Sequence, residues 1–224
     1  AAPRSPVLYM PVRGGPEAQA RAWLAALDGA HESELQTDFT QASLRAWMRA
    51  HPGHRRFTIL RHPLTRAHHV FCQRILPVGE GSFARVRRVI QRTHGLDLPE
   101  DWPDAAWDAD RHRVAFAGFL RFLKDNLAGA TNLRIAGEWC SQSVALQGMG
   151  DFAPPDHVLR ETEMPVWLPR SATAVGRPEA PPPAVTPEDG PIPLREIHDE
   201  TIERLAREVY ARDYERFGFG DWTG

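Results

Sequence analysis

A strand end, an arginine and a helix start meet within residues 56–71, and together they can bind an anion. Residues 57–60 form a short apolar run between charged residues, which predicts a buried strand. Arg61 follows it, and Pro63 suits the first turn of a helix that carries Arg66. Orphan amides and the helix dipole favour a phosphate at such a point, and arginine can bind it bidentately. The alternative is a surface turn with two solvated arginines.

A second strand, turn and helix near the N-terminus offers a similar arrangement. Residues 7–10 are apolar and predict a strand, and the turn at Gly14 and Gly15 separates them from a helical pattern. That pattern begins at Glu17 and ends near Gly29. Backbone amides at the helix start would face a bound phosphate.

The first stretch resembles a motif of the sulfotransferases that use 3′-phosphoadenosine 5′-phosphosulfate (PAPS). Arg61, Pro63, Arg66, His69 and Phe71 have the spacing of the family's R-D-P-x-x-R-x-x-S-x-[YF] motif, with His69 in place of serine. The resemblance implies that Arg61 and His69 hold the 3′-phosphate of PAPS and that Arg66 belongs to the same cofactor site.

The N-terminal loop is similar to the P-K-x-G-G-T-S-like loop that holds the 5′-phosphosulfate in sulfotransferases acting on carbohydrates. Three positions match: Pro11, Gly14 and Gly15. Three depart, with Val12 for lysine, Pro16 for threonine and Glu17 for serine. The departures remove a cation and an amide donor and add a carboxylate, which opposes a sulfated phosphate. Arg13 is the nearby cation, and we assign it the catalytic place of the missing lysine.

The resemblance also implies a general base and an acceptor site. Where the family often has a histidine base upstream of the arginine motif, this chain has Asp38. A buried carboxylate can act as a base, but an aspartate just before Thr40 is also typical of a helix cap. Trp139 and Gln142 match the family's H-W-x-P-Q segment, and a Trp face with an amide suits a sugar ring, core packing being the alternative.

The C-terminal residues carry the most specific match. Residues 202–217 have an apolar stripe at helical spacing that stops at Gly218. Residues 209–219 resemble the family's closing L-Y-x-x-D-[YF]-x-x-F-G-Y segment. With the earlier matches, the resemblance spans essentially the whole chain.

Composition limits the partners and cofactors. The chain of 224 residues has 27 basic and 29 acidic side chains, so its net charge implies no nucleic-acid partner. No apolar run is long enough to span a membrane, and no secretory signal pattern opens the chain. The two cysteines favour a reducing compartment, so we expect a cytoplasmic protein without a membrane partner. Four histidines are interpreted as solvated, without a carboxylate or cysteine at matching spacing, and no metal site is predicted: His51, His54, His68 and His69.

We therefore predict an α/β fold with a central, mostly parallel sheet flanked by helices, in the P-loop-like arrangement that the resemblance implies. One domain is expected over residues 1–224, with a proline-rich extended connection at about 153–193. The implied activity is transfer of a sulfuryl group from PAPS to a hydroxyl of a carbohydrate or similar acceptor. The alternative is a catalytically inactive binding module with the same fold, because Val12, Pro16 and Glu17 depart from the catalytic pattern.

Overall fold

The chain divides into two compact units in a computed structural model that describes residues 1–184 and 190–224. The sheet unit comprises Ala1–Arg61 and Val144–Thr186, and the helical unit comprises His62–Ser143 and Pro187–Gly224. The single domain expected over residues 1–224 stays a prediction.

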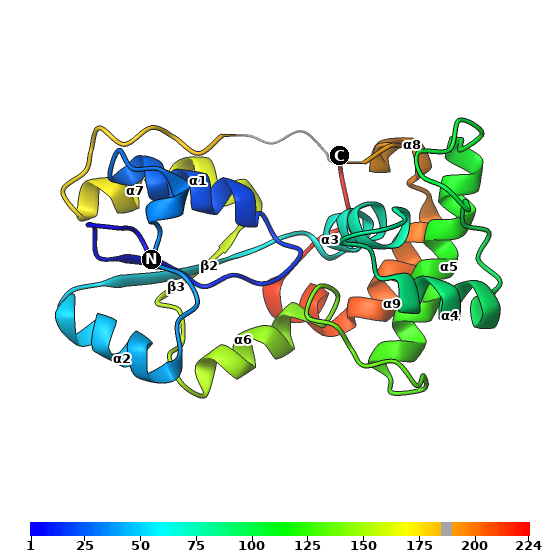
Figure 1. Ribbon diagram of the computed structural model, residues 1–224, viewed down its shortest axis with the longest axis horizontal. Helices are drawn as coiled ribbons and strands as arrows, with labels where there is room; N and C mark the ends of the chain where they lie inside the picture. The colour runs from blue at the N-terminus through cyan, green and yellow to red at the C-terminus, as the bar shows by residue number, and fades with distance from the viewer. Residues whose placement is uncertain (185–189) are drawn as a thin grey trace. The chain divides into compact units, whose positions relative to one another are not determined.

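The sheet unit is built on three parallel strands, which confirms the α/β class. β1 (Val7–Tyr9) and β3 (His157–Arg160) flank β2 (Arg55–Leu60), and both pair with it in parallel (Figure 1). In the register of the sheet, Phe57 lies opposite Tyr9 on one side and His157 on the other. The two strands predicted from apolar runs are therefore present, and they are neighbours.

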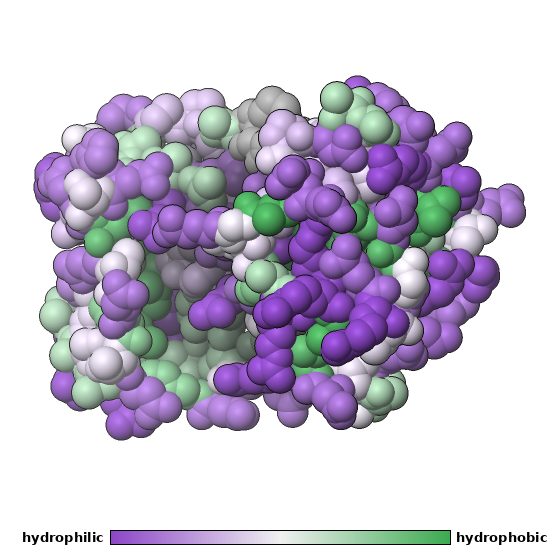
Figure 2. All heavy atoms as spheres, turned by 45° about the vertical axis from the view of Figure 1, so that its right-hand side comes forward, coloured by the Kyte–Doolittle hydropathy of each residue, from purple (hydrophilic) through white to green (hydrophobic). Residues whose placement is uncertain are grey.

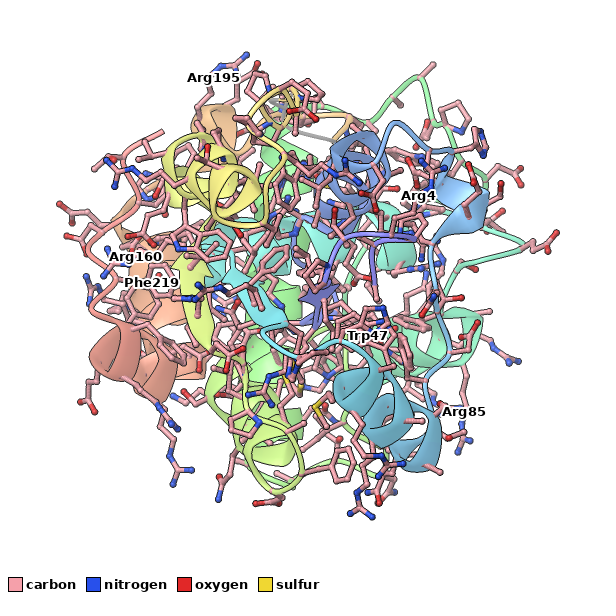
Figure 3. The ribbon with its side chains drawn as sticks, turned by 90° about the vertical axis from the view of Figure 1, so that its left-hand side faces the viewer. Arg4, Trp47, Arg85, Arg160, Arg195 and Phe219 are labelled. Atoms are coloured by element: carbon pink, nitrogen blue, oxygen red, sulfur yellow. The ribbon has the colours of Figure 1, made fainter. Side chains whose placement is uncertain are left out.

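Helices cover both faces of this sheet. α1 (Glu17–Leu27) and α7 (Met164–Ala174) lie on one face and α2 (Gln41–Ala50) on the other (Figure 1). Alternate strand residues point to opposite faces. The α1 and α7 side buries a core that includes Val7, Tyr9, Trp23, Phe57, Ile59, Leu159 and Leu168. On the other face Leu8 packs against Trp47 of α2, which lies between the helix and the sheet (Figure 3).

The segment 153–193 differs from the extended connection expected from its prolines. It contains β3, the short turn η3 (Glu161–Glu163) and α7. Pro165 occupies the first turn of α7, where its missing amide hydrogen costs no helical hydrogen bond, and Pro169 lies inside the helix. The prediction therefore does not hold for residues 157–174, and residues 185–189 of that stretch lie outside the described residues.

The helical unit is organised around α5 (Ala109–Leu127). This helix packs against α9 (Glu200–Phe217) and α4 (Ala84–His94) (Figure 1). It starts after Asp108, which caps it by accepting a hydrogen bond from the Arg111 backbone amide. Its buried face is rich in aromatic residues: Phe116, Phe119 and Phe122.

The remaining helices begin and end largely at the predicted signals. α3 (Pro63–Val70) starts at its proline and continues into the π-helical turn η2 (Phe71–Ile75). α9 ends at Gly218, whose φ of 61° lies in the left-handed region that glycine adopts readily. The other short helices are η1 (Glu32–Glu34), α6 (Gln142–Gly150) and α8 (Leu194–Ile197).

Hydrophilic residues cover most of the face shown in Figure 2, and hydrophobic residues form small separate groups on it. Among the helices of the described residues, none combines the length and the apolar character needed to cross a bilayer.

Candidate functional site

The carboxyl edge of the sheet gathers the anion-binding candidates of the sheet unit. Because β1, β2 and β3 run parallel, the residues that follow them lie at the same edge. The Gly14-Gly15 loop follows β1, Arg61 follows β2 and Glu161 follows β3. Open α/β sheets bind their ligands at this edge. The sheet therefore brings together the two predicted phosphate sites of this unit.

The Gly14-Gly15 loop needs both of its glycines. Gly14 has a φ of 77°, which other residues rarely adopt. The Gly15 amide donates a hydrogen bond of 3.0 Å to the Val12 carbonyl oxygen. A Cβ at Gly15 would lie 2.8 Å from that oxygen and 3.5 Å from the carbonyl oxygen of Ile59. The loop therefore packs directly on the end of β2, close to Arg61.

The positions where this loop departs from the sulfotransferase pattern have different surroundings. Val12 is buried, whereas Arg13 is exposed, so the two neighbouring side chains point apart. Pro16 precedes α1 without a side-chain cap, and Glu17 places a carboxylate in the first turn. Glu17 thus interacts with the helix dipole that would otherwise attract an anion.

Arg61 is already paired with a carboxylate. Its Nε and Nη2 donate hydrogen bonds of 2.8 and 2.7 Å to the two carboxylate oxygens of Glu161. The Arg61 side chain is 9% exposed and that of Glu161 is 31% exposed. Such a bidentate pair has the geometry that arginine uses for phosphate. A phosphate that binds Arg61 through the same two donors would have to displace Glu161.

Tyr9 adds a buried hydroxyl to the same edge. Its Oη has no hydrogen-bond partner among the described residues. Burial, and then the charge of Glu17, raise the pKa of this phenol, while Arg61 acts in the opposite direction. The hydroxyl therefore stays protonated and is a hydrogen-bond donor that is closed off from solvent. Sequence reasoning placed Tyr9 only in a strand and did not identify this buried donor.

Asp38 is neither buried nor the cap of α2. It is exposed, has a φ of 54°, and accepts a hydrogen bond of 2.9 Å from the Thr37 hydroxyl. The cap is Thr40, whose Oγ1 accepts from the Ser43 amide at 3.1 Å. The interpretation of Asp38 as a helix cap was therefore wrong, and the burial that favours a carboxylate base is absent in this conformation.

Two of the predicted cofactor-binding residues, Arg66 and His69, belong to the helical unit. Arg66 is buried, and its guanidinium donates to the carbonyl oxygens of Cys140 at 2.7 Å and Gly137 at 2.9 Å. His69 is half-buried on α3. In this arrangement Arg66 holds the 137–140 loop, so two of its donors are engaged with the protein backbone.

Trp139 and Gln142 are both buried in the helical unit. The Trp139 indole is 1% exposed, and its Nε1 donates to Asn126 Oδ1 at 2.8 Å. Gln142 is fully buried, and its backbone N–H donates to an oxygen of Asp213 at 2.8 Å. A sugar ring could reach the Trp139 face only if this unit opened.

Two segments that resemble the sulfotransferase family, residues 139–142 and 209–219, hold each other in place. Asp213 is fully buried, and it accepts four hydrogen bonds at the start of α6. The donors are the Ser141 hydroxyl, the Gln142 amide, the Ser143 amide and the Ser143 hydroxyl. The Tyr210 hydroxyl donates to the Trp139 carbonyl oxygen at 3.1 Å. These motif residues therefore have a structural explanation that needs no ligand.

A buried group of potential metal ligands lies in the helical unit. His68, Cys72 and His112 place one ligand atom each within 4.8 Å of one another. Burial lowers the pKa of His68 to about 3 and that of His112 to about 4, so both imidazoles are neutral near pH 7. The interpretation of His68 as solvated was therefore wrong. Its i, i+4 spacing to Cys72 was visible in the sequence, but His112 is remote in the chain.

The helical unit also has a surface pocket of about 540 Å³ beside α4. Its lining includes Arg85, Arg88 and Arg92 together with His94 and Asp125. The arginines favour an anionic group there. None of the site residues predicted from the sequence lines this pocket.

Comparisons of the chain with protein-family models, with curated proteins and with solved structures gave no match in any of the three.

Proposed function

We propose that the chain is a sulfotransferase-like protein that binds the 3′-phosphoadenosine group of PAPS at the carboxyl edge of its sheet. The observation that carries the proposal is the convergence of the Gly14-Gly15 loop, Arg61 and the unpartnered Tyr9 hydroxyl at this edge. A glycine loop at a helix start, a guanidinium and a neutral donor together suit a nucleotide phosphate.

In the proposed reaction, PAPS gives its sulfuryl group to a hydroxyl of a carbohydrate or similar acceptor. The acceptor oxygen attacks sulfur, the bond from sulfur to the bridging phosphate oxygen breaks, and a base takes the hydroxyl proton. Arg61 binds the 3′-phosphate, and Arg13 stabilises charge on the bridging oxygen. The resemblance assigns the base to Asp38, whose exposure leaves it without the burial that favours this role.

We expect the proposed sulfuryl transfer to be slow, because residues at the same edge of the sheet oppose it. Buried Val12 replaces a lysine, and Glu17 adds a carboxylate at the helix start. Glu161 neutralises Arg61 and repels an incoming phosphate. Losing one preorganised donor to a developing oxyanion typically costs about 10²–10³ in rate. Sulfuryl transfer by this chain is therefore expected to be slow or undetectable.

Calorimetric titration with the desulfated product, 3′-phosphoadenosine 5′-phosphate, tests the donor site. Glu161→Gln removes the charge that competes for Arg61, so we expect binding at least about tenfold tighter than in the wild type, equivalent to about 1.4 kcal/mol. Arg61→Gln should abolish binding. Glu163→Gln is the matched control, because Glu163 lies on the same turn and accepts from the Arg160 amide instead. It should leave the affinity unchanged.

A second candidate function is the binding module that has lost the donor site, and the Arg61–Glu161 pair favours it. In that case the internal carboxylate serves as a permanent partner of Arg61 and holds β2 to β3. The same titration separates the two functions. If Glu161→Gln keeps its circular dichroism spectrum and still binds no nucleotide, the donor-site proposal fails and the binding module remains.

A further inference from the structure

The helical unit contains a buried cluster that the proposed sulfuryl transfer does not use. The His-Cys cluster consists of His68 on α3, Cys72 on η2 and His112 on α5, and all three side chains are buried. His68 and Cys72 are four residues apart, so they lie on the same side of successive turns. Cys72 also lies in a π-helical turn, a distortion that is frequent at functional sites.

The spacing of the ligand atoms matches a single small ion. Nε2 of His68 lies 2.9 Å from Nε2 of His112, and Cys72 Sγ lies 3.6 and 3.9 Å from these two nitrogens. Around tetrahedral zinc, with Zn–N of about 2.0–2.1 Å and Zn–S of about 2.3 Å, nitrogen and sulfur ligands lie about 3.5–3.6 Å apart. Two nitrogen ligands lie about 3.3–3.4 Å apart. The sulfur therefore stands at nearly the required distances, and the two nitrogens must separate by about 0.4 Å.

We propose that this His-Cys cluster is a zinc site, with Nε2 of His68, Sγ of Cys72 and Nε2 of His112 as ligands. Two imidazoles and a thiolate are a donor set that zinc prefers, and a fourth position remains for water or an external ligand. Binding releases the thiol proton of Cys72. The ion would join α3 and η2 to α5 inside the helical unit.

Aromatic rings and backbone surround the His-Cys cluster. Phe71 packs edge-on against His112, and Phe116 packs edge-on against His68, with ring centroids 5.2 Å apart in both pairs. A Cβ on Gly190 would lie 3.1 Å from Cys72 Sγ, so backbone also covers the cluster. A hydrophobic shell of this kind restricts access of water to a metal site.

Trp107 disfavours metal binding, because its hydrogen bond to His112 fixes the tautomer of that imidazole. Its indole Nε1 lies 3.0 Å from His112 Nδ1 and can only donate, so Nδ1 must accept there. The proton of neutral His112 is therefore on Nε2, directed at His68. A ligating Nε2 moves this proton to Nδ1, where it meets the indole N–H, so metal binding requires Trp107 to rotate. Trp107 is thus a positioning residue that weakens the site.

The test uses the full chain, freed of metal by a chelator and titrated with Zn²⁺ and with Co²⁺ as a spectroscopic probe. We expect one ion per chain and a thiolate-to-cobalt charge-transfer band. Cys72→Ser should lose the band, and the matched Cys140→Ser, which alters the other cysteine of the chain, should keep it. A wild-type chain that binds no ion, or a band that survives in Cys72→Ser, overturns the proposal.

Two further measurements do not depend on the folding of Cys72→Ser. In the wild type, Zn²⁺ should protect Cys72 but not Cys140 from alkylation, as read by peptide mass mapping. Trp107→Phe removes the opposing N–H, so we expect zinc to bind about tenfold more tightly, the lower end of the effect typical of residues that hydrogen-bond to metal ligands. If Cys72 is alkylated in the zinc-free chain and to the same extent with zinc, or if Trp107→Phe binds zinc more weakly, the assignment is contradicted. None of these readouts depends on nucleotide binding.

Discussion

Replacing Asp213 by alanine should lower the free energy of unfolding of the helical unit by about 3–5 kcal/mol. The carboxylate is fully buried and accepts hydrogen bonds from two backbone amides and two serine hydroxyls. The hydroxyls can rotate towards other acceptors, but the amides of Gln142 and Ser143 are fixed at the start of α6. At about 1.5 kcal/mol or more for each hydrogen bond to a charged group, the two amides alone account for about 3 kcal/mol.

Urea denaturation, followed by tryptophan fluorescence and by far-UV circular dichroism, measures this loss. Asp221→Ala is the matched control, because Asp221 lies in the same unit and pairs with Arg207 at an exposed position. An exposed pair contributes about 0–1 kcal/mol, so the control should change little. If Asp213→Ala loses less than about 1 kcal/mol, the amides have found other partners and the structural explanation of this motif residue is wrong.

Three other outcomes follow from the sheet unit. Gly15→Ala should lower stability by about 1–3 kcal/mol in urea denaturation, because its Cβ would lie 2.8 Å from a carbonyl oxygen; unchanged stability would mean that the loop can shift. Burial alone would raise the pKa of the Asp28 carboxyl, but hydrogen bonds led by that of Ser5 outweigh it and lower the pKa. As the pH is lowered, the Asp28 carboxyl of the unfolded chain, with a pKa of about 3.9, is protonated before that of the folded chain. The free energy of unfolding therefore decreases as the pH is lowered below about 4. Acid titrations of stability should be flatter for Asp28→Asn, and equal slopes would contradict this. Pro16→Thr with Glu17→Ser should strengthen PAPS binding in calorimetry, since the change restores an amide donor and removes a carboxylate; unchanged affinity would exclude the loop from the donor site.

Local signals predicted the elements whose causes are local. A short apolar run specified β2, Pro63 specified the start of α3, and Gly218 specified the end of α9. β3 was missed because four residues between prolines give too little periodicity, and the strand is defined by its pairing with β2, about 100 positions earlier in the chain.

The residues of the candidate sites were likewise predictable only where the signal is local in the sequence. The resemblance selected Arg61 but gave no indication of Glu161, whose proximity depends on the order of strands. His68 and Cys72 were recognisable as a helical pair, whereas His112 joins them only through packing of α5. Burial of Trp139 and Arg66 could not be read from residue types, because both types also serve on surfaces.

Glu161 can be regarded as a tethered anion with its own effective concentration at Arg61. The folded sheet fixes Glu161 beside Arg61, so a free anion must compete with a carboxylate that is already in place. The exchange replaces one ion pair of Arg61 by another, so added salt weakens both states. Nucleotide binding should therefore depend less on ionic strength in the wild type than in Glu161→Gln. Small monovalent anions at low concentration would leave the arginine paired, and only a ligand with several simultaneous contacts would displace the carboxylate.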